Sequence, residues 1–144
     1  MRWRRSAAIT LVLAGCASGR ATPVATLSPS AVEEPVTAAI SAALDADRRL
    51  SPADSLWDPE ALVVANGTLR YAPPRFAGIE PGGDAAITSS RLEVRQSLVW
   101  VYLDYRWISV TQSLAREGRA TVILTPKPGG VGWRIIHLHS STVP

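Results

Sequence analysis

This chain of 144 residues has very little cysteine and lysine, and it has no phosphate-binding motif. The sequence has one cysteine, Cys16, and one lysine among its fifteen basic residues. A single cysteine cannot form an internal disulfide bond, so a fold held together by disulfides is excluded. No Gly-rich phosphate loop, serine-nucleophile elbow or dinucleotide-binding fingerprint is present. We therefore expect no cofactor.

Excess positive charge is also missing from most of the chain. The formal net charge is +3, but three of the fifteen basic residues, Arg2, Arg4 and Arg5, lie within the first five positions. If residues 1–15 are removed as a leader, twelve basic residues remain against twelve acidic ones. Proteins that bind nucleic acids need a clustered basic surface, and scattered arginines in a neutral chain do not provide one. Nucleic acid is therefore not an expected partner.

The first sixteen residues have the three parts of a bacterial secretory leader. A basic start precedes an apolar stretch at 7–14, which is too short for a membrane-spanning helix of about 20 residues. The sequence Leu13-Ala14-Gly15-Cys16 then resembles the lipobox of bacterial lipoproteins residue for residue. The resemblance implies that residues 1–15 are a lipoprotein signal peptide and that Cys16 receives a diacylglycerol thioether and an N-acyl chain. The alternative is an ordinary thiol in a cleaved peptide or an apolar helix.

A tether and one domain are expected to follow the leader. Residues 16–32 are mostly alanine, serine, threonine, glycine and proline, which bury too little apolar surface to fold. Residues 33–144 suffice for one domain with a single core. The acylated Cys16 would anchor this domain to a membrane of the bacterial cell envelope. Ala17 rather than aspartate follows the cysteine, which in lipoproteins favours the outer membrane, facing the periplasm, over the inner membrane.

A helix is predicted at the start of the domain. Apolar residues recur every four positions at Val36, Ile40 and Leu44, which is typical of a helix with one buried stripe. We expect the helix to begin near Val32. Pro35 would then lie in the first turn, where a proline is tolerated because its missing N–H has no partner there.

A second, short helix is predicted from Ser51-Pro52, where a serine cap precedes a proline, to Asp58-Pro59. After it the apolar residues recur at every second position, which is typical of strands. Asn66-Gly67 is a strong signal for a tight hairpin turn. Strands are predicted at 62–65, 68–71, 92–95, 98–109, 119–125 and 133–140, the last four as an antiparallel meander. Helices followed by strands predict an α+β fold with the helices on one face of a curved sheet.

The last predicted strand carries the most specific motif of the chain. The segment Gly132-Trp133-Arg134-Ile135-Ile136-His137-Leu138-His139-Ser140-Ser141 resembles the ending of the nuclear transport factor 2-like superfamily. It is most similar to the SnoaL-like branch and to the association domain of calcium/calmodulin-dependent kinase II. The resemblance extends over about residues 33–142 and includes the first helix and the segments 75–79 and 98–102. One departure is that residues 80–84 leave room for little more than a turn where family members have a third helix.

This resemblance implies a cone-shaped, cystatin-like α+β fold. A curved antiparallel sheet would carry the N-terminal helices on its concave face and enclose a pocket, and two copies would form a homodimer packed through their sheets. The expected function is a lipid-anchored SnoaL-like domain of the cell envelope that binds a small molecule or a peptide without established catalysis. Two alternatives stay open, because the fold does not decide function: a dehydratase- or isomerase-type proton-transfer enzyme, and a structural dimeric assembly module.

The long strand at 98–109 holds one set of candidate ligand-binding residues. Side chains alternate between the two faces of a strand, so Trp100, Tyr102, Asp104 and Arg106 share one face. If that face lines the pocket, Tyr102 is a hydrogen-bond donor and Asp104 is a base or an anchor for the ligand. In the alternative, the more apolar residues between them face the core, and Asp104 and Arg106 form a pair at the solvent or dimer surface.

Two histidines of the last strand complete the candidate ligand-binding set. His137 and His139 share a face, and imidazole is the usual acid or base near neutral pH and a common metal ligand. No cysteine or histidine remains to complete a metal site, so no metal is expected. In the catalytic alternative, Asp104 and His139 transfer the proton with help from Tyr102. Otherwise the histidines make hydrogen-bonded packing contacts at the sheet edge or the dimer surface.

Overall fold

A computed structural model describes residues 28–109 and 111–144 of the chain. The predicted signal peptide, the acylation site Cys16 and the tether up to residue 27 lie outside the described residues. Among the residues that are described, no helix is both long and apolar enough to cross a membrane. The described elements are one α-helix, one 3-10 turn and six strands.

Helix α1 spans Pro29–Arg48. Pro29 is the first residue of the helix, a position where proline is favoured. The helix therefore begins before the predicted Val32, and Pro35 lies inside it rather than in its first turn. Val32 is only 4 % exposed, and the packed helix therefore extends beyond the predicted domain boundary at residue 33. The predicted apolar stripe is confirmed, because it is buried along the whole helix at Val32, Val36, Ile40, Ala43 and Leu44.

The prediction of a second helix is wrong. Residues Asp54–Leu56 form a single 3-10 turn, η1, and strand β1 (Trp57–Ala65) begins directly after it. The Asp58-Pro59 pair, predicted to end a helix, lies inside this strand. The reason is a long-range contact: Trp57 is buried and lies opposite Ile135 of the last strand, and this pairing outweighs the local serine–proline signal.

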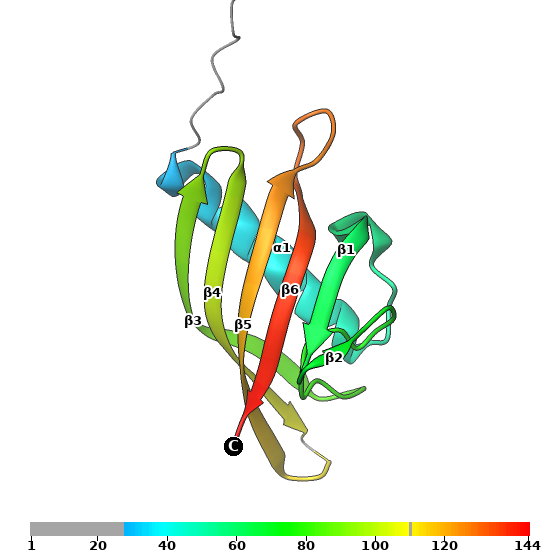
Figure 1. Cartoon of the computed structure of the whole chain (residues 1–144). Helices are drawn as coiled ribbons and strands as arrows, with labels where there is room; N and C mark the ends of the chain where they lie inside the picture. The colour runs from blue at the N-terminus through cyan, green and yellow to red at the C-terminus, as the bar shows by residue number, and fades with distance from the viewer. Residues whose placement is uncertain (1–27, 110) are drawn as a thin grey trace, which may run out of the picture.

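Six strands form one curved, mixed sheet in the order β2-β1-β6-β5-β4-β3. Strands β3 to β6 form the predicted antiparallel meander, and β1 and β2 form the predicted hairpin. Strand β1 runs parallel to β6, which corrects the expectation of a purely antiparallel sheet. Figure 1 shows α1 crossing one face of the sheet, so the predicted α+β architecture is confirmed. The strands after β1 are β2 (Thr68–Leu69), β3 (Asp84–Arg95), β4 (Leu98–Ser109), β5 (Leu114–Pro126) and β6 (Trp133–Val143).

An apolar core fills the space between α1 and the sheet. The rings of Trp57 and Phe76 meet edge to face with their centroids 6.5 Å apart, and those of Phe76 and Tyr105 at 5.5 Å. These rings belong to one cluster with the buried stripe of α1. Strand β4 contributes every second residue to this cluster, none more than 4 % exposed: Val99, Val101, Leu103, Tyr105 and Trp107.

A buried carboxylate holds the connection between β2 and β3 against the end of α1. Asp47 is 1 % exposed, and its Oδ2 accepts hydrogen bonds from the backbone N–H groups of Arg75 at 2.7 Å and Phe76 at 2.8 Å. Arg75 in turn donates from its guanidinium to the carbonyl of Pro52 at 2.8 Å. One side chain of the helix therefore fixes the backbone of a loop 28 residues further along the chain.

Strands β4 and β6 hold the same connection from the sheet side. The Ala77 N–H donates to Ser140 Oγ at 2.9 Å, and the Tyr105 hydroxyl donates to the Ala77 carbonyl at 2.6 Å. Gly118 of β5 makes room for Tyr105, because a Cβ atom at this position would lie 2.3 Å from the ring. Residues 70–83 contain bends and turns and no helix, as the departure from the family pattern predicts.

Asp47 is expected to make the protein less stable as the pH rises from about 4 to about 6. Burial raises the pKa of Asp47 from 3.8 to about 6, although hydrogen bonds from Phe76 and Arg75 oppose the shift. In this range the unfolded state has already lost a proton that the folded state keeps, so the free energy of unfolding falls with rising pH. The variant Asp47→Asn keeps an acceptor oxygen and cannot titrate. Urea unfolding between about pH 4 and pH 7 should show a smaller fall for this variant than for the wild type.

The matched control for this experiment is Asp45→Asn. Asp45 lies on the same helix, but its side chain is 38 % exposed and pairs with Arg48 and Arg49. The control should keep the wild-type dependence on pH. Equal curves for the wild type and Asp47→Asn would contradict the assignment.

Candidate functional site

The candidate residues predicted from the sequence lie on the face of the sheet that α1 does not cover, the open face. Side chains alternate along β4. Every second residue from Val99 to Trp107 points toward α1, and the residues between them, including Trp100, Tyr102, Asp104 and Arg106, point away from it. Of the two alternatives for this strand, the one in which the apolar residues face the core is therefore confirmed, and the polar set does not line a space between sheet and helix. The reason is that burying Asp104 and Arg106 would cost their hydration, whereas the alternate set is apolar. The ion-pair partner of Asp104 is Arg119 rather than the expected Arg106. The open-face candidates are Trp100, Tyr102, Asp104, Arg106, His137 and His139.

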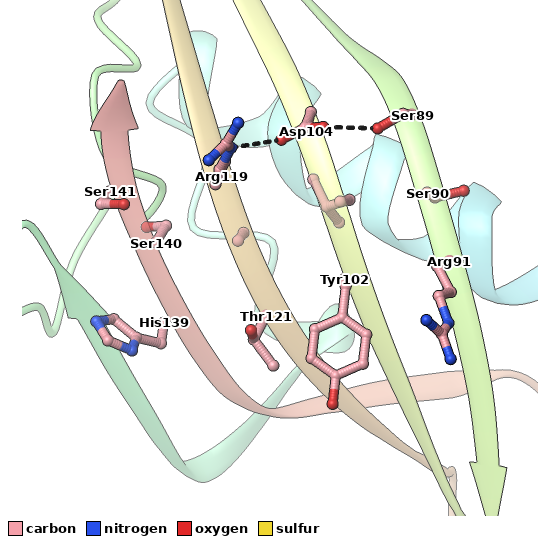
Figure 2. Close-up of a pocket in the computed structure, with 12 residues that line it drawn as sticks. Ser89, Ser90, Arg91, Tyr102, Asp104, Arg119, Thr121, His139, Ser140 and Ser141 are labelled. Carbon is pink, nitrogen blue, oxygen red and sulfur yellow. Dashed lines mark hydrogen bonds and ion pairs between the residues drawn. The ribbon is translucent and has the colours of Figure 1, made fainter. Parts of the chain in front are cut away.

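A hollow of about 480 Å³ indents the open face across β3, β4, β5 and β6. Three of the six candidates line it: Tyr102, Asp104 and His139. The other three lie outside its lining. Figure 2 shows the lining side chains projecting from separate strands around the indentation. The structure therefore brings half of the predicted site residues together in one hollow. This hollow lies on the open face, whereas a pocket between the sheet and the helices was expected.

Three neighbouring rows of residues, running across the four strands, make up the lining. The aspartate row consists of Ser89, Asp104, Arg119 and Ser141. The tyrosine row consists of Arg91, Tyr102, Thr121 and His139. Between them lies a row whose side chains point to the opposite face, so that its backbone forms the floor: Ser90, Leu103, Ala120 and Ser140. The hollow is the furrow between the first two rows.

The polar groups of the aspartate row largely satisfy one another. The Ser89 hydroxyl donates to Asp104 Oδ2 at 2.8 Å, and Arg119 Nε donates to Asp104 Oδ1 at 3.1 Å (Figure 2). Asp104 is the only acidic residue of the lining, and both of its carboxylate oxygens have a donor. The Arg119 side chain is 74 % exposed, and in the part of the chain that the structure describes its terminal N–H groups make no hydrogen bond.

The tyrosine row, in contrast, has polar groups without a hydrogen-bond partner among the described residues. Within residues 28–109 and 111–144, the side chains of Tyr102, Thr121 and His139 make no hydrogen bond. Figure 2 places the ring of Tyr102 between Thr121 and Arg91. Arg91 makes one exposed ion pair, at 3.1 Å, with Glu93. Two hydroxyls and an imidazole are thus free to bind a ligand.

An apolar row borders the tyrosine row on the side away from the aspartate row. Burial lowers the pKa of His137 in this row, and the neighbouring His139 lowers it further. The neutral imidazole of His137 is therefore favoured, which suits an apolar setting. This row, called the apolar row for its apolar members Leu62, Ile123 and Trp100, also contains His137 and ends on β3 at the charged Glu93.

Asp104 and His139 do not form the pair that the catalytic alternative requires. They lie on β4 and β6 with β5 between them and in different rows, which places their Cα atoms about 12 Å apart at ordinary sheet spacings. The hydrogen bonds of Asp104 go to other residues, Ser89 and Arg119. Among the described residues, no three His, Cys, Asp or Glu side chains gather into a group that could hold a metal ion.

Sequence reasoning missed five of the residues that face the hollow. The pattern predicts a strand only at 92–95, whereas β3 begins at Asp84 and brings Ser89 and Arg91 beside β4. Arg119 and Thr121 lie in a predicted strand, and the buried Ala120, Val122 and Leu124, at every second position of it, mark the opposite face. That alternation is the signal that identifies both as open-face residues. Ser141 lies just past the predicted end of the last strand.

Comparison with known proteins identifies relatives in fold only. No protein-family model matches the chain, and a comparison with curated proteins finds no match. A nuclear transport factor 2-like superfamily protein from Salmonella enterica serovar Typhimurium superposes with a TM-score of 0.62 at 16 % identity, over 81 % of this chain and 94 % of that one.

Two further solved structures agree with this result. A candidate ketosteroid isomerase from Parabacteroides distasonis has a TM-score of 0.55 at 14 % identity, over 85 % of this chain and 93 % of that one. The CaMKII hub of S. rosetta has a TM-score of 0.53 at 13 % identity, over 85 % of this chain and 98 % of that one. Identities of this size establish architecture and leave activity open. With one helix packed on a curved six-stranded mixed sheet, the chain has the nuclear transport factor 2-like α+β fold.

Proposed function

We propose that this chain is a lipid-anchored SnoaL-like domain of the bacterial cell envelope that binds a small molecule or a short peptide in the hollow of its open face. The observation that carries the proposal is the hollow of about 480 Å³, whose lining includes Tyr102, Thr121 and His139. In the described part of the chain, the polar groups of these three side chains make no hydrogen bond. Small-molecule sites typically occupy about 300–1,000 Å³ and converge a few polar groups. The filled core leaves the open face as the favoured place for a ligand.

The anchor in this proposal is an acylated Cys16. Its support is the lipobox-like sequence, and the proposed place of the domain is the outer membrane, facing the periplasm. Residues 17–28 separate Cys16 from the first residue of α1, and twelve residues span at most about 40 Å. The domain would therefore work within a few tens of ångströms of the bilayer.

Binding is favoured over proton transfer as the function. One neighbour in fold is a candidate ketosteroid isomerase. However, the separation of Asp104 from His139 leaves the proposed acid–base pair without direct contact. A bound ligand that bridges them would be needed before this alternative gained support.

Homodimer assembly through the open face is a second candidate, favoured by a specific observation. Leu62 of β1 is 49 % exposed and Leu69 of β2 is 43 % exposed. Leu69 lies opposite Val64, so the two leucines are diagonal neighbours at the β1–β2 edge of the open face. Contiguous exposed apolar surface marks interaction sites in proteins, so these leucines are the residues around which an interface would form. A hub domain, the CaMKII hub of S. rosetta, is among the neighbours in fold.

Filling the hollow should abolish binding. Thr121→Trp places a large ring in the furrow, whereas the matched variant Ala115→Trp adds the same ring on β5, on the same face but outside the lining. The full chain in a neutral detergent is titrated with benzoate, benzamide, benzylamine, indole and tetra-alanine, followed by amide chemical shifts. At least one compound should shift residues of the three rows in the wild type and in Ala115→Trp, and none in Thr121→Trp. No shift in the wild type, or equal shifts in Thr121→Trp, would refute the site.

Cys16→Ser should abolish membrane attachment and leave the precursor uncleaved, because lipidation requires the thiol and precedes cleavage. Expression in a bacterium followed by detergent phase partitioning measures the attachment, and the mass of the product measures the cleavage. The control is Ser18→Ala, which leaves the thiol in place and should behave as the wild type. A Cys16→Ser product that still enters the detergent phase would disprove the anchor.

The dimer should depend on the exposed leucines. The double variant Leu62→Asp/Leu69→Asp places charges in the predicted interface and should be monomeric. Leu50→Asp changes a leucine that is 51 % exposed after the end of α1, and it should remain dimeric. Native mass spectrometry from detergent gives the oligomeric state of each chain. A monomeric wild type would remove the dimer from the proposal.

A further inference from the structure

The charged groups around the hollow are paired with one another. Arg119 lies 3.1 Å from its acidic partner Asp104, and Arg91 lies 3.1 Å from Glu93. Each arginine of the lining thus has a carboxylate beside it, so neither sign of charge is in excess there. Charge selects between ligands where a site has a surplus of one sign. The hollow therefore favours a ligand without net charge.

The ring of Tyr102 gives the hollow a flat apolar surface. Tyr102 is 40 % exposed, and Figure 2 shows its ring nearly face-on, so that the ring lies along the sheet. In the part of the chain that the structure describes, no cation and no second aromatic ring stacks on it. Trp100 on the same face differs, because Arg95 lies 5.8 Å from the centroid of its ring. The face of Tyr102 is thus open to a ligand that can cover it.

Polar groups lie on both sides of this ring. Thr121 on β5 and Arg91 on β3 are the neighbours of Tyr102 across the strands, and Figure 2 shows them on either side of it. His139 lies beyond Thr121 on β6. Adjacent strands are about 4.8 Å apart, so these groups surround a ligand ring that is stacked on Tyr102. The hydroxyl and the imidazole can donate or accept hydrogen bonds, whereas the guanidinium only donates.

A sugar in its pyranose form has the shape and the polarity that match this arrangement. The faces of a pyranose ring carry C–H groups, which can cover an aromatic ring. Its hydroxyl groups project from the edge of the ring, and each of them can donate and accept a hydrogen bond. An aromatic ligand would cover Tyr102 equally well, but it would offer no partners to Thr121 and His139 once water is displaced from them.

We propose that the hollow binds an uncharged sugar. One face of the pyranose ring covers Tyr102, and the hydroxyl groups at its edge form hydrogen bonds with Thr121 on one side and Arg91 on the other. This inference rests on the proposed function and deepens it by naming the chemical class of the ligand. A single sugar and a polysaccharide chain present the same ring, so the test compares both lengths.

Sugars are titrated into the full chain in a neutral detergent that has no sugar headgroup, followed by amide chemical shifts. The probes are glucose, N-acetylglucosamine, cellotriose and chitotriose, with glycerol as hydroxyls without a ring and indole as a ring without hydroxyls. At least one sugar should shift residues of the three rows with a dissociation constant about tenfold lower than that of glycerol or indole. Added salt should leave this binding unchanged, because the sugar has no charge. Tighter binding of a trimer than of its monomer identifies a polysaccharide as the source, and equal binding a single sugar; both support the inference.

Variants of Tyr102 separate stacking from hydrogen bonding. Tyr102→Ala removes the covered ring and should weaken sugar binding about tenfold, whereas Tyr102→Phe keeps the ring and should weaken it only about twofold. The matched control is Tyr71→Ala, which removes a tyrosine that is 83 % exposed and lies outside the lining. This control should bind the sugar as the wild type does.

Thr121→Val tests the edge of the site with little change of shape. It removes one hydroxyl and should weaken sugar binding about threefold to tenfold. Valine is favoured in strands, so this variant tests the inference even where Tyr102→Ala disturbs folding. Its control is Thr125→Val on the same strand, outside the lining, which should have no effect.

The outcomes separate this inference from the function on which it rests. If indole or tetra-alanine shifts the three rows as strongly as every sugar does, the hollow is a binding site and the sugar inference is wrong. Equal weakening by Tyr102→Ala and Tyr71→Ala, or by Thr121→Val and Thr125→Val, also refutes it. If no compound of either titration shifts the three rows, the binding site and the inference fail together.

Discussion

The buried carboxylate of Asp47 is the contact on which the arrangement of helix, loop and sheet depends. It satisfies two backbone N–H groups of the connection between β2 and β3, at Arg75 and Phe76. An unpaired buried N–H costs about 1–3 kcal/mol, so no apolar residue can replace this carboxylate without loss. With Ser140 and Tyr105 holding Ala77, the loop is fastened from three elements. Phe76 is thereby held in the core by a connection that contains no helix.

Because aromatic side chains fill the core, the candidate site residues lie on the opposite face of the sheet. The rings of Trp57, Phe76 and Tyr105 occupy the space beneath α1. The polar residues of β3 to β6 are therefore left on the open face, where a row of inward-pointing side chains creates a furrow between two rows that point outward. The hollow follows from the alternation of side chains on strands and needs no additional loop or helix.

The sequence predicts the fold more fully than the site. The four-residue spacing of Val36, Ile40 and Leu44 predicts α1 because a helix stripe depends only on neighbours along the chain. The parallel pairing of Trp57 with Ile135 depends on a contact 78 positions away, and local signals at Ser51-Pro52 predict the wrong element instead. The face of Asp104 is a similar case. Alternation shows which residues share its face, but only the packing of α1 decides which face is covered.

The place of β6 in the sheet has a consequence for how the protein folds. It lies between β1 and β5, and among the described strands it is the only one that pairs the β1–β2 hairpin with the rest of the sheet. A central strand of the sheet is therefore synthesised after the other five strands. The β1–β2 hairpin cannot pair with the rest of the sheet until β6 is present. Contacts between such distant segments slow folding, because a long loop must close before they form. A chain interrupted before Trp133 would lose a central strand rather than an edge.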